Sequence, residues 1–287
     1  MTTSLETPSV PTGPGDVDAL TALLRGRRVV VLTGAGCSTE SGIPDYRGPG
    51  TRARARNPIQ HREFLARPEV RARYWARSLI GWPRFSAARP NAAHQALAAL
   101  EDAGHVLGLI TQNVDRLHHA AGSRRVIELH GALARVRCLA CGALEPREQL
   151  QRRLLELNPG FTAASAESRP DGDAELHDDA VRAFQVAACL ACEGTLKPDV
   201  VFFGDNVPAP TVQEAFALLE EGDAFLVVGS SLAIYSGFRF LQRAVDRRMP
   251  VGLINIGECR GHEWMEVRVE SRAGEVLPRL ASALGAS

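Results

Sequence analysis

The chain has 287 residues with 33 basic and 33 acidic side chains, so its formal net charge at pH 7 is zero. This balance argues against a protein that binds nucleic acid through general basic charge. No run of about 18 apolar residues occurs, and residues 1–15 lack the apolar core of a signal peptide. We therefore expect a cytoplasmic protein without nucleic-acid or membrane partners, whose first 15 residues form a disordered leader.

A helix from Val17 to Arg25 is predicted to precede a first strand at residues 28–33, whose apolar run is typical of burial on both faces. Gly34 and Gly36 follow, and they would allow a tight turn and close approach to a pyrophosphate. An ordinary turn also explains a lone G-x-G. The next residues, GIPDYRG at 42–48, add a carboxylate and a guanidinium that a turn does not need, which favours a ligand site.

Residues 48–88 are rich in arginine and aromatic side chains and predict a helical insertion. A solvated helix face is the commoner explanation of its tandem arginines, and phosphate contact is the alternative. Tyr74 and Arg77 form a Tyr-x-x-Arg group within it. The group is either a core aromatic beside a surface arginine, or a pair that recognises substrate.

Further buried strands are predicted, and polar or glycine residues follow each of them. They lie at 106–111, 126–131, 200–205, 224–228 and 251–254. Because the carboxyl ends of parallel strands meet at one edge of a sheet, this edge should bind a ligand. An amide pair, Gln112 and Asn113, stands where a dehydrogenase would place an acidic residue, which counts against hydride transfer. His130 lies at the end of its predicted strand and suits a general base, although a lone histidine is most often structural.

Two C-x-x-C pairs predict one metal site, because each pair can chelate an ion from a tight turn. The ligands would be Cys138, Cys141, Cys189 and Cys192. Four thiolates leave no open position, so the ion should be a structural zinc, with redox disulfides as the alternative. Cys37 and Cys259 stand alone in the sequence and receive no catalytic role.

The motifs together resemble those of the sirtuins, which remove acyl groups from lysine and consume NAD. The matching segments are GAGCSTESGIPDYRG, TQNVDRLHHAAG, ELHG, the two cysteine pairs, KPDVVFFGD, VGSSL and INIG, spread over residues 20–280. The resemblance implies an NAD-dependent protein lysine deacylase that releases nicotinamide and O-acyl-ADP-ribose. Alternatives are a protein mono-ADP-ribosyltransferase using the same NAD site, or a non-catalytic binding module.

The resemblance also implies residue roles. His130 would deprotonate the ribose hydroxyl, while Asn113 and Asp115 order the ribose and a water. Asp45 and the backbone at Ile43 would hold the nicotinamide carboxamide. The full set of implied NAD contacts is Gly34, Ala35, Gly36, Ser38, Ile43, Asp45, Tyr46, Arg47, Gln112, Asn113, Val114, Asp115, Gly229, Ser230, Ser231, Asn255, Ile256, Gly257 and Ala273.

Val201 and Phe203 would wall the acyl-lysine tunnel, and the peptide would add as a strand between segments near Gly204 and Ser236. The nearest subfamily is class II, including its animal mitochondrial branch, and the chain would be a bacterial homologue. In some sirtuins that remove acidic acyl groups, the Arg of Tyr-x-x-Arg pairs with the acyl carboxylate. The loop between Gly48 and Pro58 is shorter than in that branch, and Ala273 replaces a cysteine.

The predicted fold is α/β, a Rossmann-like doubly wound parallel sheet with a smaller zinc-binding and helical module. Residues 16–47, 89–134 and 197–287 would form the NAD-binding domain. Residues 48–88 and 135–196 would form the small module, and the protein is expected to act as a monomer on acyl-lysine protein substrates.

Overall fold

The structure is a computed structural model, and it describes residues 17–45, 59–161 and 181–286. The predicted leader, the loop from Gly48 to Pro58, and the predicted NAD contacts Tyr46 and Arg47 lie outside this part of the chain. No helix in the described ranges is long and apolar enough to cross a bilayer.

The large lobe is built on a six-stranded sheet with the order β3-β2-β1-β7-β8-β9, in which every neighbouring pair is parallel. Its strands are β1 (Val29–Thr33), β2 (Val106–Thr111), β3 (Val126–Glu128), β7 (Ala224–Val228), β8 (Val251–Ile254) and β9 (Val267–Val269). Strand order reverses direction beside β1, which is the point where open α/β sheets bind ligands. The predicted doubly wound α/β fold is confirmed.

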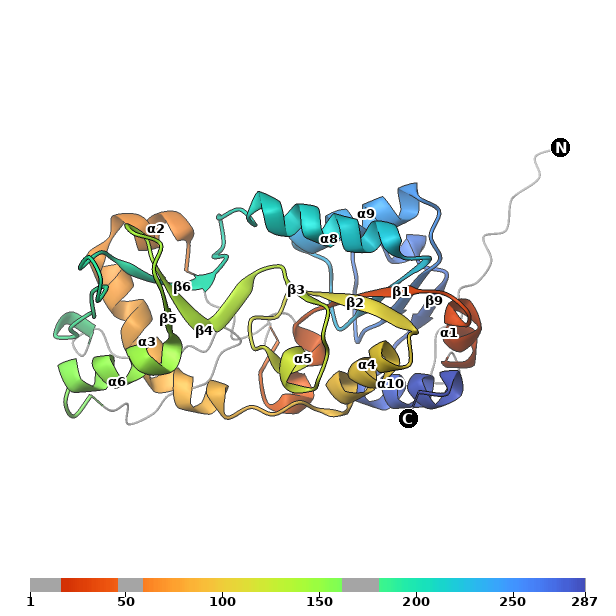
Figure 1. The fold of residues 1–287 in the computed structure, drawn as a ribbon, viewed down its shortest axis with the longest axis horizontal. Coiled ribbons are helices and arrows are strands. Elements are labelled where there is room, and N and C mark those ends of the chain that lie inside the picture. Colours follow the sequence, from red (N-terminus) through yellow and green to blue (C-terminus); the bar gives the residue numbers. More distant parts are fainter. Residues whose placement is uncertain (1–16, 46–58, 162–180, 287) are drawn as a thin grey trace.

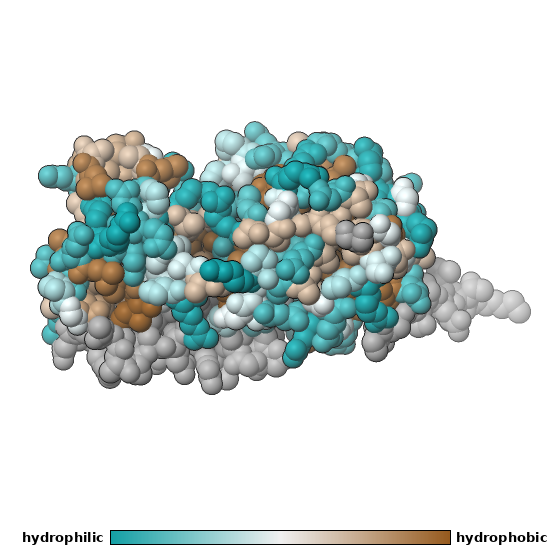
Figure 2. Space-filling view, turned by 60° about the horizontal axis from the view of Figure 1, so that its bottom comes forward, coloured by the Kyte–Doolittle hydropathy of each residue, from teal (hydrophilic) through white to brown (hydrophobic). Residues whose placement is uncertain are grey.

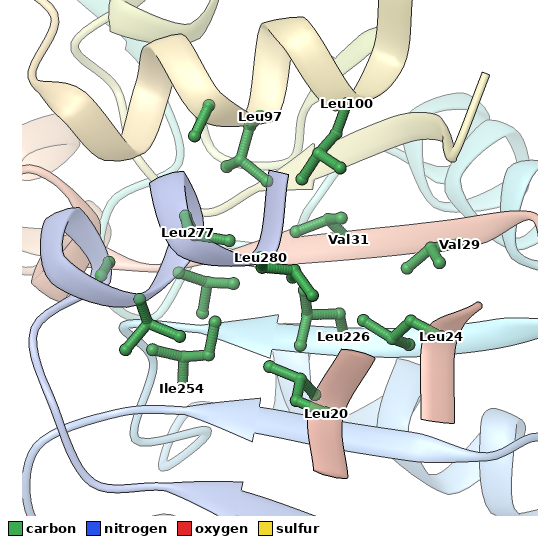
Figure 3. Packing of buried hydrophobic residues seen from close by; sticks show 14 of the residues in the cluster. Leu20, Leu24, Val29, Val31, Leu97, Leu100, Leu226, Ile254, Leu277 and Leu280 are labelled. Atoms are coloured by element: carbon green, nitrogen blue, oxygen red, sulfur yellow. The ribbon is translucent and has the colours of Figure 1, made fainter. Parts of the chain in front are cut away.

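Helices cover both faces of this sheet because successive residues of β1 point to opposite sides. Val29 and Val31 pack in one core cluster, whereas Val30 and Leu32 pack in the other. The first cluster is covered by α1 (Val17–Leu24), α4 (Ala92–Asp102) and α10 (Ala273–Leu284), and the second by α8 (Ala209–Glu221) and α9 (Tyr235–Asp246). Figure 3 shows the first cluster, with Leu97 of α4 and Leu277 of α10 directed toward the strands.

The small lobe is a three-stranded antiparallel sheet of order β5-β4-β6 with helices beside it. Its elements are α2 (His61–Ala66), α3 (Pro68–Ser86), β4 (Gly131–Cys138), β5 (Leu144–Pro146), α6 (Arg147–Leu157) and β6 (Leu196–Val200). Figure 1 shows these elements together at the left, beside the parallel sheet. Residues of α2, α3, β4, α6 and β6 share one apolar core, so the described part of the arginine-rich insertion is helical as predicted, and it packs against the cysteine-bearing segment.

Two predicted strands end differently from the expectation. The strand expected at 126–131 ends at Glu128, and Gly131 instead begins β4 of the other sheet. Gly131 has φ 77°, and a Cβ there would lie 2.1 Å from the carbonyl oxygen of Asp199, so only glycine fits this crossing. The strand expected at 200–205 lies earlier, at Leu196–Val200, because this segment pairs with β4.

Exposed large apolar side chains of the described residues gather mainly on the small lobe. They include Leu65, Leu139, Leu144, Leu155, Leu157, Val186 and Leu190. Figure 2 shows brown surface at the left end of the molecule, where this lobe lies, and more teal on the large lobe. The predicted domain boundaries themselves stay a prediction.

Candidate active site and metal centre

A cavity of about 1230 Å³ lies at the carboxyl ends of the parallel strands and extends to the small lobe. It collects most of the residues predicted to contact NAD or substrate. Those that line it are Ala35, Gly36, Ser38, Ile43, Asp45, Tyr74, Gln112, Asn113, Val114, Asp115, His130, Val201, Phe203, Gly229, Ser230, Ser231, Asn255, Ile256, Gly257 and Ala273. Gly34 and Arg77 are not among the lining residues.

The glycine loop is shaped by its contact with the loop after β7. The amide of Gly36 donates to the carbonyl of Gly229 at 2.9 Å. A Cβ on Gly34 would lie 2.7 Å from Cβ of Ser230, and one on Gly36 would lie 2.9 Å from Cα of Gly229. Close packing of two loops therefore requires these glycines, in addition to the approach of a pyrophosphate that the sequence suggested.

Asn113, Asp115 and Ser38 form one hydrogen-bonded group at the end of β2. Asn113 Nδ2 donates to the carbonyl of Gly34 and to Ser38 Oγ, both at 3.0 Å. Ser38 Oγ in turn donates to a carboxylate oxygen of Asp115 at 2.7 Å. Burial raises the pKa of Asp115, while the amide of Leu117 and the Ser38 hydroxyl oppose that shift. The group fixes the glycine loop to the strand end and presents polar atoms to the cavity.

His130 is held in a tautomer that suits a base. Its Nδ1 lies 3.0 Å from the carbonyl oxygen of Gln112, which can only accept, so Nδ1 carries the proton. Nε2 therefore has a lone pair, and Ser236 Oγ lies 2.8 Å from it as the donor. Burial lowers the pKa of His130, and the charge of Arg239 lowers it further, so the imidazole is neutral near pH 7.

The wall from the small lobe and α9 contains apolar and cationic side chains. Tyr74 is 2 % exposed and lies against Phe64 and Phe202, with ring centroids 5.6 and 5.5 Å away. The amide of Val201 donates to the carbonyl of His130 at 2.9 Å, which ties this wall to the histidine. Tyr74 therefore serves the core and the cavity together. Arg77 is only half-buried, and its role stays a prediction.

Sequence reasoning missed several polar residues of the cavity. Arg239 on α9 and Arg260 after β8 both line it, as does Tyr235. The α9 pattern YSGFRF places Phe238 and Phe240 in the core, and the arginine between them lies at the cavity. The amphipathic pattern after Ser231 could have identified this helix, but not which of its polar residues reaches the site.

The four predicted metal ligands come together at the end of β4. Their sulfur atoms all lie within 4.8 Å of one another, with Cys138 and Cys192 3.5 Å apart and Cys141 and Cys189 3.8 Å apart. Zn–S bonds of about 2.3 Å in a tetrahedron place sulfurs about 3.8 Å apart, so the set fits a structural zinc ion. Amides of Ala140 and Ala191 donate to Cys138 and Cys189 sulfurs at 3.4 Å, which orients them. All six cysteines are free thiols.

A family model described as the Sir2 family matches residues 34–236. The chain is 49% identical over 276 residues to an "NAD-dependent protein deacetylase 1" of Streptomyces coelicolor, covering 96% of this chain and 92% of the relative. It is 48% identical over 274 residues to human "NAD-dependent protein lipoamidase sirtuin-4, mitochondrial", covering 94% of this chain and 87% of the relative.

Solved structures of Sir2 proteins also match this chain. One described as "Sir2 bound to acetylated peptide" superposes with a TM-score of 0.74 at 29% identity, covering 94% of this chain and 99% of the other. Another, "Sir2-p53 peptide-NAD+", has a TM-score of 0.73 at 30% identity with the same coverage. The resemblance named from the sequence is thereby confirmed.

Proposed function

This chain belongs to the Sir2 family, and from that premise we propose that its cavity binds NAD together with an acylated lysine of a protein. The protein is an NAD-dependent protein lysine deacylase, as its relatives are. The observation that carries the residue assignment is that one cavity joins the glycine loop, the Asn113 group, the His130 base and an apolar wall.

The glycine loop and the loops after β7 and β8 would hold the ADP-ribose part of NAD, with Ser230 and Asn255 at its ribose or phosphate groups. Ser230 Oγ donates to Oε1 of Gln112 at 2.6 Å, so these two polar side chains are already aligned. Asp45 and Ile43 would hold the carboxamide. When bound, NAD supplies the ribosyl carbon that accepts the acyl oxygen, with nicotinamide as the leaving group.

His130 acts as the general base in this proposal. Its Nε2 lone pair faces the cavity and can take a proton from a ribose hydroxyl, while Nδ1 stays bonded to the Gln112 carbonyl. Ser236 occupies that lone pair in the structure, so the substrate hydroxyl replaces the serine hydroxyl before proton transfer. Asn113 and Asp115 orient the ribose and a water.

The apolar wall suits a long acyl chain. Phe203, Val201 and Tyr74 all line the cavity. The cavity measures about 1230 Å³, above the roughly 300–1,000 Å³ usual for small-molecule pockets, so it has room for an acylated lysine beside NAD. We therefore extend the proposal to longer acyl groups, in line with the human relative named a lipoamidase, and to carboxylate-ended ones, because Arg239 and Arg260 line the same cavity.

The four-cysteine zinc cluster has a structural role. It closes the turn after β4 and the turn before β6, far along the chain from each other, and so completes the small lobe. The small lobe supplies one wall of the cavity. We further propose that the protein works as a monomer in the cytoplasm, a reducing compartment in which its cysteines stay free for zinc.

A screen of acyl-lysine peptides with NAD, followed by mass spectrometry, tests the function. Nicotinamide and an O-acyl-ADP-ribose of matching mass should appear together, and only when the peptide is acylated. Nicotinamide release in peptide-free samples containing a protein acceptor, with ADP-ribose found on that acceptor, would instead identify an ADP-ribosyltransferase.

A further inference from the structure

Three potential metal ligands meet in the interior beneath the glycine loop, away from the four-cysteine cluster. Cys37 comes from the short helix η2 (Ala35–Cys37), His94 from α4 and His118 from α5 (Leu117–Ala120). One ligand atom of each lies within 4.8 Å of the other two. Their side chains are enclosed, with exposed fractions of 0%, 0% and 1%. None of the roles assigned to the cavity uses these side chains.

The outer ring nitrogens of both histidines have polar partners. Nδ1 of His94 lies 2.9 Å from Oδ1 of Asn91, to which it can donate in the tautomer that carries its proton on Nδ1; in the other tautomer it accepts from the Asn91 amide at 3.3 Å. Nε2 of His118 lies 2.9 Å from Thr33 Oγ1, which itself donates to Thr111 Oγ1 at 2.8 Å and therefore accepts from the histidine. Metal-binding histidines almost always donate their second N–H to an oxygen in this way, which points the lone pair at the metal.

The inner ring nitrogens have no hydrogen-bond partner in the structure. They are Nε2 of His94 and Nδ1 of His118, and both are fully buried. A buried polar atom without a partner is destabilising, so two of them beside a buried thiol point to a missing ligand.

We propose that Cys37, His94 and His118 form a second metal site, which binds a zinc-type divalent ion through one thiolate and two imidazoles. One thiolate with two imidazoles is a donor set that zinc accepts, and three protein ligands leave a fourth position for water. Binding displaces the thiol proton of Cys37 to solvent. Ligand atoms in such a site lie about 3.5 Å apart, and the 4.8 Å bound on the three atoms here is compatible with that spacing.

The site adjoins the glycine loop through its backbone. Asn91 Nδ2 donates to the carbonyl of Cys37 at 2.8 Å, and the next residue, Ser38, donates to Asp115 at 2.7 Å. An ion at this position would therefore fix the loop to the start of α4 and to α5. Because the three side chains are enclosed, the ion enters only when the loop moves away from them.

Metal content of the full-length protein tests the proposal. Protein equilibrated with excess Zn²⁺ and then desalted should hold two zinc ions per chain, whereas Cys37→Ser should hold one. Cys259→Ser is the matched control, because Cys259 is also a buried thiol outside the four-cysteine cluster, and it should still hold two. His94→Gln provides a second variant in case Cys37→Ser does not fold, as judged by circular dichroism.

Co²⁺ added to protein that already holds one zinc gives an independent readout. The proposal expects thiolate-to-cobalt charge-transfer absorption and tetrahedral d–d bands at one added equivalent, absent from Cys37→Ser and from His94→Gln. A wild-type protein that never exceeds one metal ion per chain overturns the proposal. So does a second ion that both variants retain.

Discussion

Ser236 Oγ lies 2.8 Å from Nε2 of His130 and occupies the lone pair on which the proposed base depends. The serine starts the first turn of α9, whereas the histidine follows β3, so the contact links two distant segments of the large lobe. A ribose hydroxyl of the substrate must take the place of the Ser236 hydroxyl as the hydrogen-bond partner of Nε2 before it can lose its proton.

His130→Ala should leave NAD binding nearly intact and reduce O-acyl-ADP-ribose formation by about 100-fold or more, as expected when a general base is lost. Single-turnover assays with mass detection measure it, and calorimetry reports NAD affinity. His105→Ala is the matched control, since His105 precedes β2 at the opposite end of the sheet and should react normally. Near-normal product from His130→Ala would remove this residue from the mechanism.

The pH profile should reflect the lowered pKa of His130. The base works in its neutral form, so kcat/KM should stay high as the pH falls to 6.5 and decline only at lower pH. Burial is the main cause of the lowered pKa, and the positive charge of Arg239 adds to it. Arg239→Met removes that charge, so the pKa of His130 should rise and the acidic limb of the kcat/KM profile should move to higher pH. A profile that is the same in both proteins contradicts the assignment of His130 as the titrating base.

Acyl selectivity should depend on a cavity arginine. A guanidinium in a desolvated cavity forms short bonds to a carboxylate, and losing one partner of such a pair costs about 2–5 kcal/mol. Arg239→Met should therefore lower kcat/KM for glutaryl-lysine about 30-fold or more while sparing acetyl-lysine. Arg77→Met tests the sequence-based proposal in parallel, and the same pattern there would show that Arg77 reaches the acyl group. If either variant loses the same factor in kcat/KM on both peptides, the arginine it replaces supports the fold and does not recognise the acyl group.

The four-cysteine zinc should be essential to the small lobe. Cys192→Ala should remove this ion and abolish cooperative unfolding of the lobe, since structural zinc supplies on the order of 10 kcal/mol in small domains. Elemental analysis and thermal unfolding measure both effects, with Cys259→Ala as the control. A zinc-depleted Cys192→Ala protein that is as stable and active as the wild type would rule this out.

Stability should fall in mild acid because buried histidines are neutral in the folded state. The pKa of His94 is lowered by burial to about 4, so between pH 6.5 and 4 the unfolded chain binds a proton that the folded chain does not. The free energy of unfolding then drops as the pH decreases through this window, by about 3 kcal/mol from His94 alone. Urea unfolding at pH 7.5 and 4, with no zinc added beyond the ion of the four-cysteine cluster, measures it. His94→Gln should flatten the dependence, whereas replacing the more exposed His262 should not.

Strand positions and the polar strand ends were predictable because buried parallel strands show continuous apolar runs. The strands Val106–Thr111, Ala224–Val228 and Val251–Ile254 have the predicted bounds. The crossing of the chain from the parallel sheet to the antiparallel sheet at Gly131 was not predictable from the sequence. It depends on a backbone contact with Asp199, which no local sequence pattern contains. The same holds for Arg239 and for the Cys37–His94–His118 cluster, which unite residues from separate elements.

The chain leaves the large lobe at His130 and returns to it at Val201, whose amide donates to the carbonyl of His130 at 2.9 Å. Gly131 pairs with Val200 just beyond, so departure and return are joined side by side. Those parts of the segment between these two points that neither line the cavity nor bind the zinc can therefore lengthen, shorten or exchange their surface while the histidine keeps its place. Selection for new protein targets can act on the inserted segment without retuning the chemistry, and an engineer can graft a different segment onto the same two anchor residues.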